Sequence, residues 1–109
     1  MELLFKKQHL KKVLRGEKTQ TRRRIGRSTL KIGSKYSIRN GWFKKAEHHI
    51  LITRRFQQQL GDISLEDVHK EGFKTLNEFK VVWTKINGDW NPNEVVTVYE
   101  FKLINRRHS

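Results

Sequence analysis

The residues best suited to chemistry lie in one short stretch, LRGEKTQTRRRIGR, from Leu14 to Arg27. It contains a Lys-Thr-x-Thr segment that begins at Lys18, ends at Thr21 and is followed directly by arginines. Guanidinium groups match phosphate oxygens bidentately, so these arginines are candidate phosphate contacts. They are Arg22, Arg23, Arg24 and Arg27. The stretch therefore has three interpretations: a phosphate-binding patch, the edge of a catalytic pocket, or a solvated polar turn.

Further basic and aromatic residues could extend this patch into a groove for single-stranded RNA. In such grooves the bases stack on aromatic rings while cations follow the phosphate backbone. Trp42 is the most attractive stacking candidate, and a partly buried cover over the core is an equally good interpretation of it. The candidate nucleic-acid contacts outside the arginine run are Lys18, Arg39, Trp42, Lys44, Lys45, Arg54 and Arg55.

The distribution of charge supports a polyanionic partner. The chain of 109 residues has 24 Lys and Arg against 11 Asp and Glu, a net charge of +13. Residues 1–58 carry 17 basic and 3 acidic side chains, whereas residues 59–109 carry 7 and 8. A generally lysine-rich surface is the alternative, but it would mix both signs along the whole chain. The asymmetry favours nucleic acid as the partner.

Composition also excludes several classes of site. Without cysteine there can be no disulfide, thiolate zinc site or cysteine nucleophile. The histidines are scattered, and the adjacent His48 and His49 would face opposite ways on a strand. We therefore expect no metal and no cofactor. No apolar run approaches the roughly twenty residues of a membrane span, and the start of the chain does not resemble a secretory signal. We expect a cytoplasmic monomer.

Hydrophobic periodicity predicts the elements that would position these residues. Strands are predicted at 2–5, 19–25, 35–39, 46–56 and 95–104, and helices at 7–15, 65–71 and about 75–87. Ser64 and Thr75 begin capping-box patterns before the second and third helices. Asn40-Gly41 favours a hairpin turn. The core is expected to include Phe79, Trp83, Tyr99 and Phe101. The order predicts one α+β domain over 1–109, with a curled sheet or small β-barrel, flanking helices and a basic tail from about 105.

The segment GEKTQTRR, which follows a helix ending near Gly16 and enters a strand, resembles the start of an ASCH domain. The resemblance continues through DISLEDVHKEGF, LNEFKVVWTKING and the terminal strand VVTVYEFKLI, and so covers nearly the whole chain. It implies a β-barrel of the PUA-like superfamily, with a cleft that accepts RNA or a nucleoside-like ligand.

Some bacterial members of this family are small enzymes that hydrolyse the N4-acetyl amide of acetylcytidine, and others have been linked to RNA binding or cleavage. The resemblance would place the enzymes' lysine, threonine and glutamate on Lys18, Thr21 and Glu71. Thr21 would attack the amide carbonyl after neutral Lys18 takes its proton, and Glu71 would orient the lysine or handle protons on the leaving amine. The assignment of nucleophile and acid–base roles stays open. A solvated helix face is the alternative for Glu71.

Strand geometry sets a condition on this site. On a regular strand Lys18 and Thr21 would face opposite sides of the sheet. We therefore expect the strand to begin after Lys18 or to contain a bulge. The predicted function is binding of RNA or a modified nucleotide in a basic cleft, and the alternative is an N4-acetylcytidine amidohydrolase. A nuclease is a third interpretation, but the sequence shows no acid–base or metal constellation for it.

Overall fold

The computed structural model describes residues 2–4, 7–26, 29–39 and 48–104, in the element order that the sequence predicts. A single 3-10 turn, η1, is added to that order. The elements are β1 (Glu2–Leu4), α1 (Lys7–Leu14), β2 (Gln20–Arg24), β3 (Lys35–Arg39), β4 (His48–Gln59), η1 (Leu60–Asp62), α2 (Leu65–Lys70), α3 (Leu76–Asn87) and β5 (Val95–Ile104). The predicted Asn40-Gly41 turn and the basic tail lie outside the described residues.

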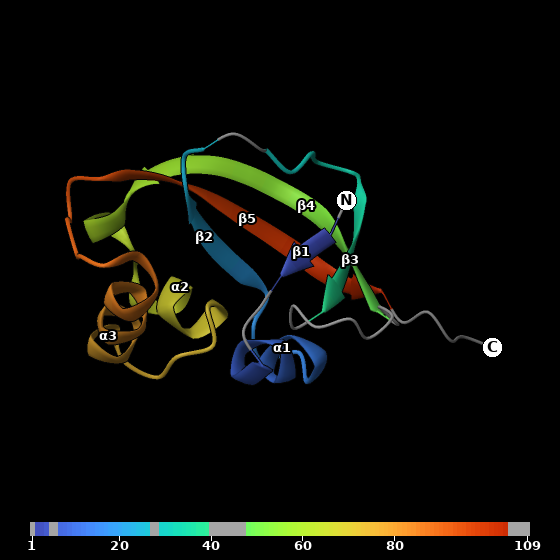
Figure 1. Ribbon diagram of the computed structural model, residues 1–109, viewed down its shortest axis with the longest axis horizontal. Coiled ribbons are helices and arrows are strands. Elements are labelled where there is room, and N and C mark those ends of the chain that lie inside the picture. Colours follow the sequence, from blue (N-terminus) through green and yellow to red (C-terminus); the bar gives the residue numbers. More distant parts are fainter. Residues whose placement is uncertain (1, 5–6, 27–28, 40–47, 105–109) are drawn as a thin grey trace.

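The strands form one sheet in the order β1-β3-β4-β5-β2. Neighbours from β3 to β2 are antiparallel, and β1 runs parallel to β3. A register shift between Ile52 and Arg54 interrupts the β4–β5 ladder, and such irregularities increase local twist. The long strands β4 and β5 curve across the molecule (Figure 1). The structure confirms the predicted α+β sheet with flanking helices.

Closure of this sheet into a barrel is not confirmed. Among the described residues β1 and β2 are the two edge strands and do not pair with each other. Strand β1 has only three residues, all of them paired with β3. The sheet is therefore curled but open within the described part of the chain.

Two hydrophobic clusters pack on the sheet, and together they bury both faces of β5. The side chains of Val96 and Val98 lie on one face of the strand. Those of Tyr99 and Phe101 lie on the other face, as alternation along a strand requires. The first cluster contains Val13, Leu30, Tyr36, Ile38, Ile50, Ile52, Tyr99 and Phe101. The second contains Leu60, Ile63, Val68, Phe73, Phe79, Trp83 and Val96, with Val82 and Trp90 against it. All four predicted core aromatics are buried.

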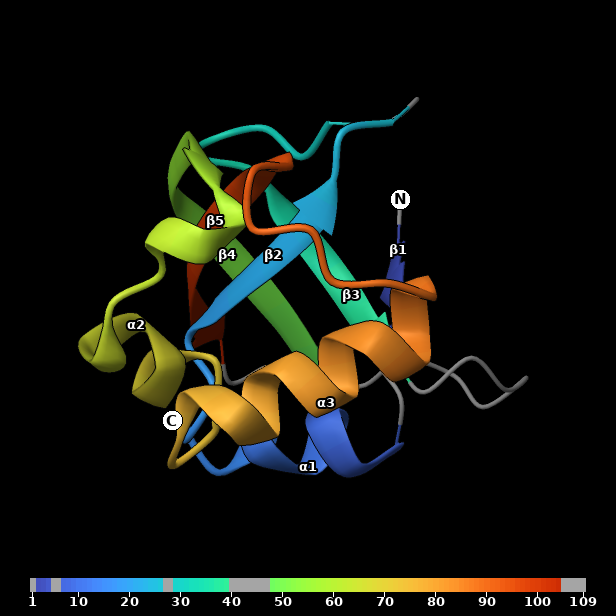
Figure 2. The same cartoon turned by 90° about the vertical axis from the view of Figure 1, so that its left-hand side faces the viewer.

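The three helices lie on one side of the sheet, with α3 running past the strands in the turned view (Figures 1 and 2). Their ends follow the sequence signals. The Ser64 hydroxyl accepts a hydrogen bond from the Asp67 backbone N–H, and Thr75 with Glu78 forms a complete capping box. Gly88 ends α3 in the left-handed region at φ 96°. These caps set where α2 and α3 begin and therefore which residues face the sheet.

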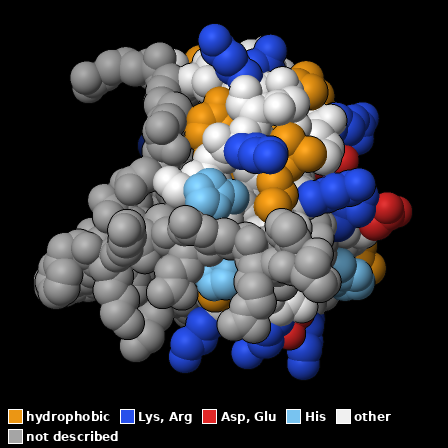
Figure 3. All heavy atoms as spheres, turned by 90° about the vertical axis from the view of Figure 1, so that its right-hand side faces the viewer, with side chains coloured by type: hydrophobic (Ala, Val, Ile, Leu, Met, Phe, Trp, Pro, Cys, Tyr) orange, Lys and Arg blue, Asp and Glu red, His pale blue; other side chains and the backbone are white. Residues whose placement is uncertain are grey.

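Basic side chains are spread over the face that carries β3. In the space-filling view of that face, lysine and arginine side chains of the described part lie near the centre and along the top, right and lower edges, with hydrophobic and histidine side chains among them (Figure 3). None of the described helices is long and apolar enough to cross a membrane.

The packing around β4 makes a first prediction. Ile52 is fully buried, so Ile52→Ala should lower the free energy of unfolding by about 3 kcal/mol through lost burial and a residual cavity. Urea denaturation followed by circular dichroism measures this change. The control Val81→Ala, at a position 47% exposed on α3, should leave stability nearly unchanged. Equal effects of the two substitutions would contradict the assignment of Ile52 to the core.

Candidate functional site

A cavity of about 220 Å³ lies between the start of β2, the helices α1 and α3, and the segment after α2. One wall is polar and carries Lys18, Thr21, Arg23 and Glu71. The other wall is largely apolar and is formed by Phe73 and, from α3, Phe79, Val82, Trp83 and Ile86, with Asn87 at the end of the same helix. The structure thus brings Lys18, Thr21 and Glu71 to one cavity, as the resemblance implied.

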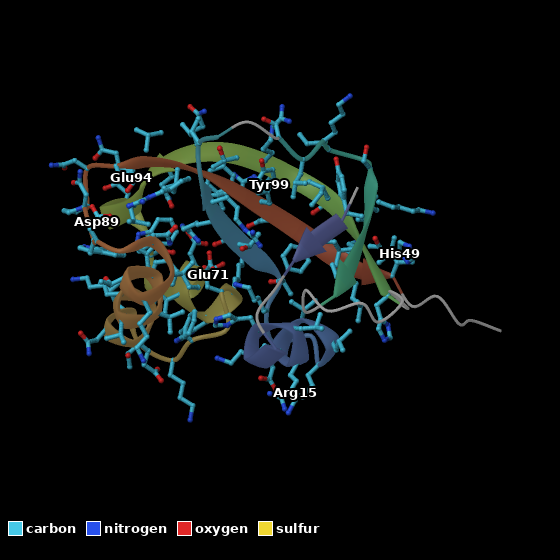
Figure 4. All side chains as sticks on the ribbon, viewed as in Figure 1. Arg15, His49, Glu71, Asp89, Glu94 and Tyr99 are labelled. Carbon is cyan, nitrogen blue, oxygen red and sulfur yellow. The ribbon has the colours of Figure 1, made fainter. Side chains whose placement is uncertain are left out.

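A buried ion pair lies within the polar wall of this cavity. Lys18 Nζ lies 2.6 Å from Glu71 Oε1 and also donates to the Glu71 carbonyl oxygen at 3.1 Å. Lys18 is 6% exposed and Glu71 is 3% exposed. Figure 4 shows Glu71 in the interior between the helices and the sheet, whereas Arg15 lies on the outside of α1. Glu71 is therefore not on a solvated helix face.

Backbone contacts explain why these two residues meet. The Thr19 N–H donates to the Lys70 carbonyl at 2.8 Å, which ties the chain before β2 to the end of α2. Gly72 follows with φ 95°, in the region that favours glycine. A Cβ atom there would lie 3.0 Å from Lys12 Cδ and 3.4 Å from Lys18 Cβ. Lys12 Nζ donates to the Gly72 carbonyl at 2.7 Å, which holds α1 against the same turn.

The electrostatics of Lys18 combine two opposing effects. Burial lowers the pKa of Lys18 below its ordinary value, and this effect exceeds the opposing one of Glu71, whose charge and hydrogen bond raise it. Arg23 and Arg22 lower it further through charge repulsion. The short contact with Glu71 positions the amine, while the surroundings make its proton easier to remove than that of an exposed lysine.

Arg22 holds the second oxygen of the same carboxylate. Its NH1 lies 3.1 Å from Glu71 Oε2, and its NH2 lies 3.3 Å from Asp67 Oδ2. NH2 also donates to Gln58 Oε1 at 2.8 Å, and NH1 donates to Gln20 Oε1. The Arg22 side chain is completely buried. A phosphate would have to compete with these four partners, so the geometry assigns Arg22 a supporting contact with Glu71.

Thr21 and Arg23 complete the polar wall. Strand β2 begins at Gln20, after Lys18, so the alternation of a regular strand does not separate Lys18 from Thr21. Thr21 is 4% exposed, and its hydroxyl oxygen accepts a long hydrogen bond of 3.4 Å from Arg23 Nε. Burial lowers the pKa of Arg23. Of the two arrangements that the sequence allowed, the structure has the one in which the strand begins after Lys18, and no bulge between Lys18 and Thr21 is needed.

The other candidate cations are dispersed. Arg24 lines the cavity rim but pairs with Asp89 and, at 2.9 Å, with Glu94. Arg54 lies 4.4 Å above the Phe56 ring and 3.8 Å from Glu100. Arg55 donates to the Leu30 carbonyl at 3.0 Å. The remaining candidates lie outside the described residues or have side chains outside them: Arg27, Arg39, Trp42, Lys44 and Lys45.

The structure does not confirm a basic cleft among the described residues. The physical reason is charge pairing between the halves of the chain: carboxylates from the second half meet arginines from the first at Glu71, Asp89 and Glu94. Within the described ranges no group of histidine and carboxylate side chains could hold a metal ion.

The sequence analysis missed the roles of two residues at or beside the site. Gln20 is fully buried and donates to Glu100 Oε2 at 2.9 Å and to Asp67 Oδ1 at 3.3 Å, so it supports Arg22 from the same strand face. Trp83 was expected only as a core residue, yet it also lines the cavity. The signal for Gln20 was its alternation with Arg22; nothing in the sequence distinguished Trp83 from other helix-face aromatics.

Comparisons with known proteins show the fold. No protein-family model matches the sequence, and no curated protein matches it significantly. Among solved structures, an ASCH domain from Lactobacillus crispatus JV V101 superposes with a TM-score of 0.67 at 21% identity, covering 87% of this chain and 69% of that one. A DUF984 protein from Enterococcus faecalis V583 gives 0.68 at 16% identity, covering 91% and 72%.

An S128A mutant of an ASCH protein from Zymomonas mobilis gives a TM-score of 0.63 at 17% identity, covering 95% of this chain and 72% of that one. Identities at this level carry the fold and no activity. The predicted ASCH-domain fold is confirmed.

The ion-pair geometry makes a second prediction. Glu71→Gln removes the carboxylate shared by Lys18 and Arg22 and leaves two buried cations facing a neutral amide. The free energy of unfolding should fall by about 3 kcal/mol, because a buried charge without its partner is strongly destabilising. Chemical denaturation at neutral pH measures this.

Glu66→Gln is the matched control, since Glu66 lies on α2, its side chain is 79% exposed, and it forms a surface ion pair with Lys70 at 3.5 Å. It should leave the unfolding midpoint unchanged. A Glu71→Gln protein as stable as the Glu66→Gln protein would show that the buried pair does not hold α2 to β2.

Proposed function

We propose that this chain, which has the ASCH-domain fold, binds RNA through one modified nucleotide whose base enters the cavity beside Lys18 and Glu71. The observation that carries the proposal is the pairing of an apolar wall, with Phe79 and Trp83, and a polar wall, with Lys18 and Glu71. Ligand pockets usually combine such apolar surface with a few placed polar groups. A nucleobase has both an apolar face and a polar edge, and so matches both walls.

The size of the cavity favours a single base. Its volume of about 220 Å³ lies below the roughly 300–1,000 Å³ typical of pockets for larger ligands. An unstacked base of single-stranded RNA can enter such a pocket while the rest of the strand stays outside. The net charge of +13 would attract the phosphate backbone at a distance. Candidate backbone contacts are the exposed Arg54 and Arg55, together with the sequence-predicted cations around Arg27, Arg39, Lys44 and Lys45.

Binding can be tested with two RNA oligonucleotides that differ in one base, one carrying N4-acetylcytidine and the other cytidine. The protein should bind the modified RNA more tightly, and Lys18→Met should weaken that binding by about tenfold, the effect of one hydrogen bond to a charged group. Lys11→Met, at an exposed position on α1, is the matched control and should keep the preference.

Fluorescence anisotropy at several salt concentrations measures both the electrostatic contribution to affinity and the preference for the modified base. Affinity for either RNA should fall steeply with ionic strength, whereas the preference for the modified base should not. Equal affinity of the unaltered protein for both RNAs at every salt concentration would reject base recognition in the cavity.

A second candidate function, hydrolysis of the N4-acetyl amide, is favoured by the 2.6 Å contact between Lys18 and Glu71. Neutral Lys18 would accept the proton of Thr21 as its Oγ forms a bond to the amide carbonyl carbon. The C–N bond would then break, and the leaving amine would take the proton back. Water would cleave the acyl–threonine ester, and Glu71 would keep the lysine oriented throughout.

Amide hydrolysis makes its own prediction. Thr21→Ala and Lys18→Ala should each lower the rate of N4-acetylcytidine hydrolysis by at least about a hundredfold, the usual scale for a lost acid–base or nucleophilic group. The control substitution Thr19→Ala, at an exposed residue next to Lys18, should leave the rate unchanged. The rate should rise with pH as Lys18 loses its proton, with an apparent pKa below 10.5, because burial lowers the pKa of this amine. Chromatographic assay of released cytidine measures the rates. Unchanged rates in both variants would remove this mechanism and leave binding alone.

A further inference from the structure

A second cavity of about 220 Å³ lies where β2 ends, against β4 and β5. Within the described residues its lining has two arginines, Arg24 and Arg55, and no carboxylate. Thr29, Gln57 and Thr97 add hydroxyl and amide groups, and all of these residues except the half-buried Thr97 are exposed to solvent. The rest of the lining is Ile25, Gly26, Phe56 and Tyr99. Accessible guanidinium, hydroxyl and amide groups without an acid favour a small anion as the ligand.

The two arginines differ in how far their charge is already balanced. Arg24 pairs with Asp89 and, at 2.9 Å, with Glu94. The Arg55 guanidinium has one contact among the described residues, a hydrogen bond from NH1 to the Leu30 carbonyl oxygen at 3.0 Å. A guanidinium has five N–H donors, so Nε and NH2 of Arg55 remain for a ligand. The cavity thus has one positive charge that no carboxylate of the described residues offsets.

Strand register explains why Arg55 lines this cavity and the adjacent Arg54 does not. Arg55 on β4 is paired with Tyr99 on β5, and both residues line the cavity. Arg54 is paired with Glu100, and successive side chains of a strand lie on opposite faces. The Arg54 guanidinium lies 3.8 Å from the Glu100 carboxylate and is absent from the lining. The two neighbouring arginines therefore have different surroundings and form a matched pair.

The second cavity adjoins the cavity beside Lys18 and Glu71. Arg24 lines both of them. Thr21, in the wall of the first cavity, is paired across the sheet with Tyr99, in the lining of the second. A nucleotide whose base enters the first cavity would therefore have its sugar–phosphate backbone near the second.

We infer that the second cavity binds a phosphodiester of the same RNA strand, with Nε and NH2 of Arg55 donating to its two non-bridging oxygens. This inference rests on the proposed binding of a modified nucleotide. A guanidinium matches two phosphate oxygens bidentately, and the single unbalanced charge of the cavity equals that of one phosphodiester. The exposed Gln57 amide adds a neutral donor beside it. Binding of one linkage here sets which nucleotide of the strand lies at the first cavity.

Neutral linkages in the RNA test this site. In an oligonucleotide with one N4-acetylcytidine, each phosphodiester near that nucleotide is replaced in turn by an uncharged methylphosphonate. For the unaltered protein, one replacement should weaken binding about tenfold more than the others, the scale of a hydrogen bond between charged groups. Arg55→Gln should bind the all-phosphate RNA about tenfold more weakly and should be insensitive to that linkage. Arg54→Gln, which removes the same charge from the adjacent residue, should keep the linkage effect. Fluorescence anisotropy gives the affinities.

Two readouts on the unaltered protein do not depend on how Arg55→Gln folds: the linkage effect itself and the Arg55 Nε–H resonance. This resonance should shift when the all-phosphate RNA binds and stay in place with the neutral group at the sensitive linkage. Equal effects of all linkages, or an undiminished linkage effect in Arg55→Gln, would overturn the inference. A preference for N4-acetylcytidine over cytidine would then leave base recognition intact. If the unaltered protein shows no such preference, the proposed function fails, and the inference fails with it.

Discussion

The site depends on one buried carboxylate held by two cations. Glu71 follows the last residue of α2, and its two oxygens contact Lys18 at 2.6 Å and Arg22 at 3.1 Å. Taking these charges out of water is costly, so the arrangement is tolerated only when every member has its partners. Lys18 lies before β2 and Arg22 lies within it. Both must therefore be placed against the end of α2 before the burial of Lys18, Arg22 or Glu71 is stable. The left-handed turn at Gly72 and its contact with Lys12 bring α1 into the same arrangement.

The same principle changes the meaning of the charge asymmetry along the chain. The first half is strongly basic and the second is close to neutral, yet folding places acids of the second half against arginines of the first. Part of the basic excess is therefore used internally, to join β2 to α2 and to the turn after α3. Arg22 is the extreme case, because its guanidinium donates to Gln20, Gln58, Asp67 and Glu71 and its side chain is fully buried. In the proposed function, attraction of nucleic acid rests on the exposed remainder.

The sequence predicted the elements well because their signals are local. Apolar periodicity located the strands and helices, and Ser64, Thr75 and Gly88 marked helix ends that the structure keeps. The meeting of Lys18, Thr21 and Glu71 was implied by the ASCH resemblance and not by spacing. Two things could not be predicted: the inward direction of Arg22 and the burial of Gln20. Each depends on contacts between side chains more than thirty residues apart in the sequence. A pattern of residue types along the chain does not predict such contacts. The expected closure of the sheet into a barrel is not confirmed among the described residues, and strand pairing, too, is non-local.

The position of β2 in the sheet has a consequence for how the chain acquires its shape. Within the described residues β2 pairs with β5 alone, and β5 comes after every other element in sequence. During synthesis on the ribosome, the strand bearing Thr21 thus has no sheet neighbour until residues 95–104 have emerged. The β3–β4 hairpin can pair earlier, because its strands are close in sequence. The cavity beside Lys18 and Glu71 is accordingly among the last parts of the nascent molecule to be completed.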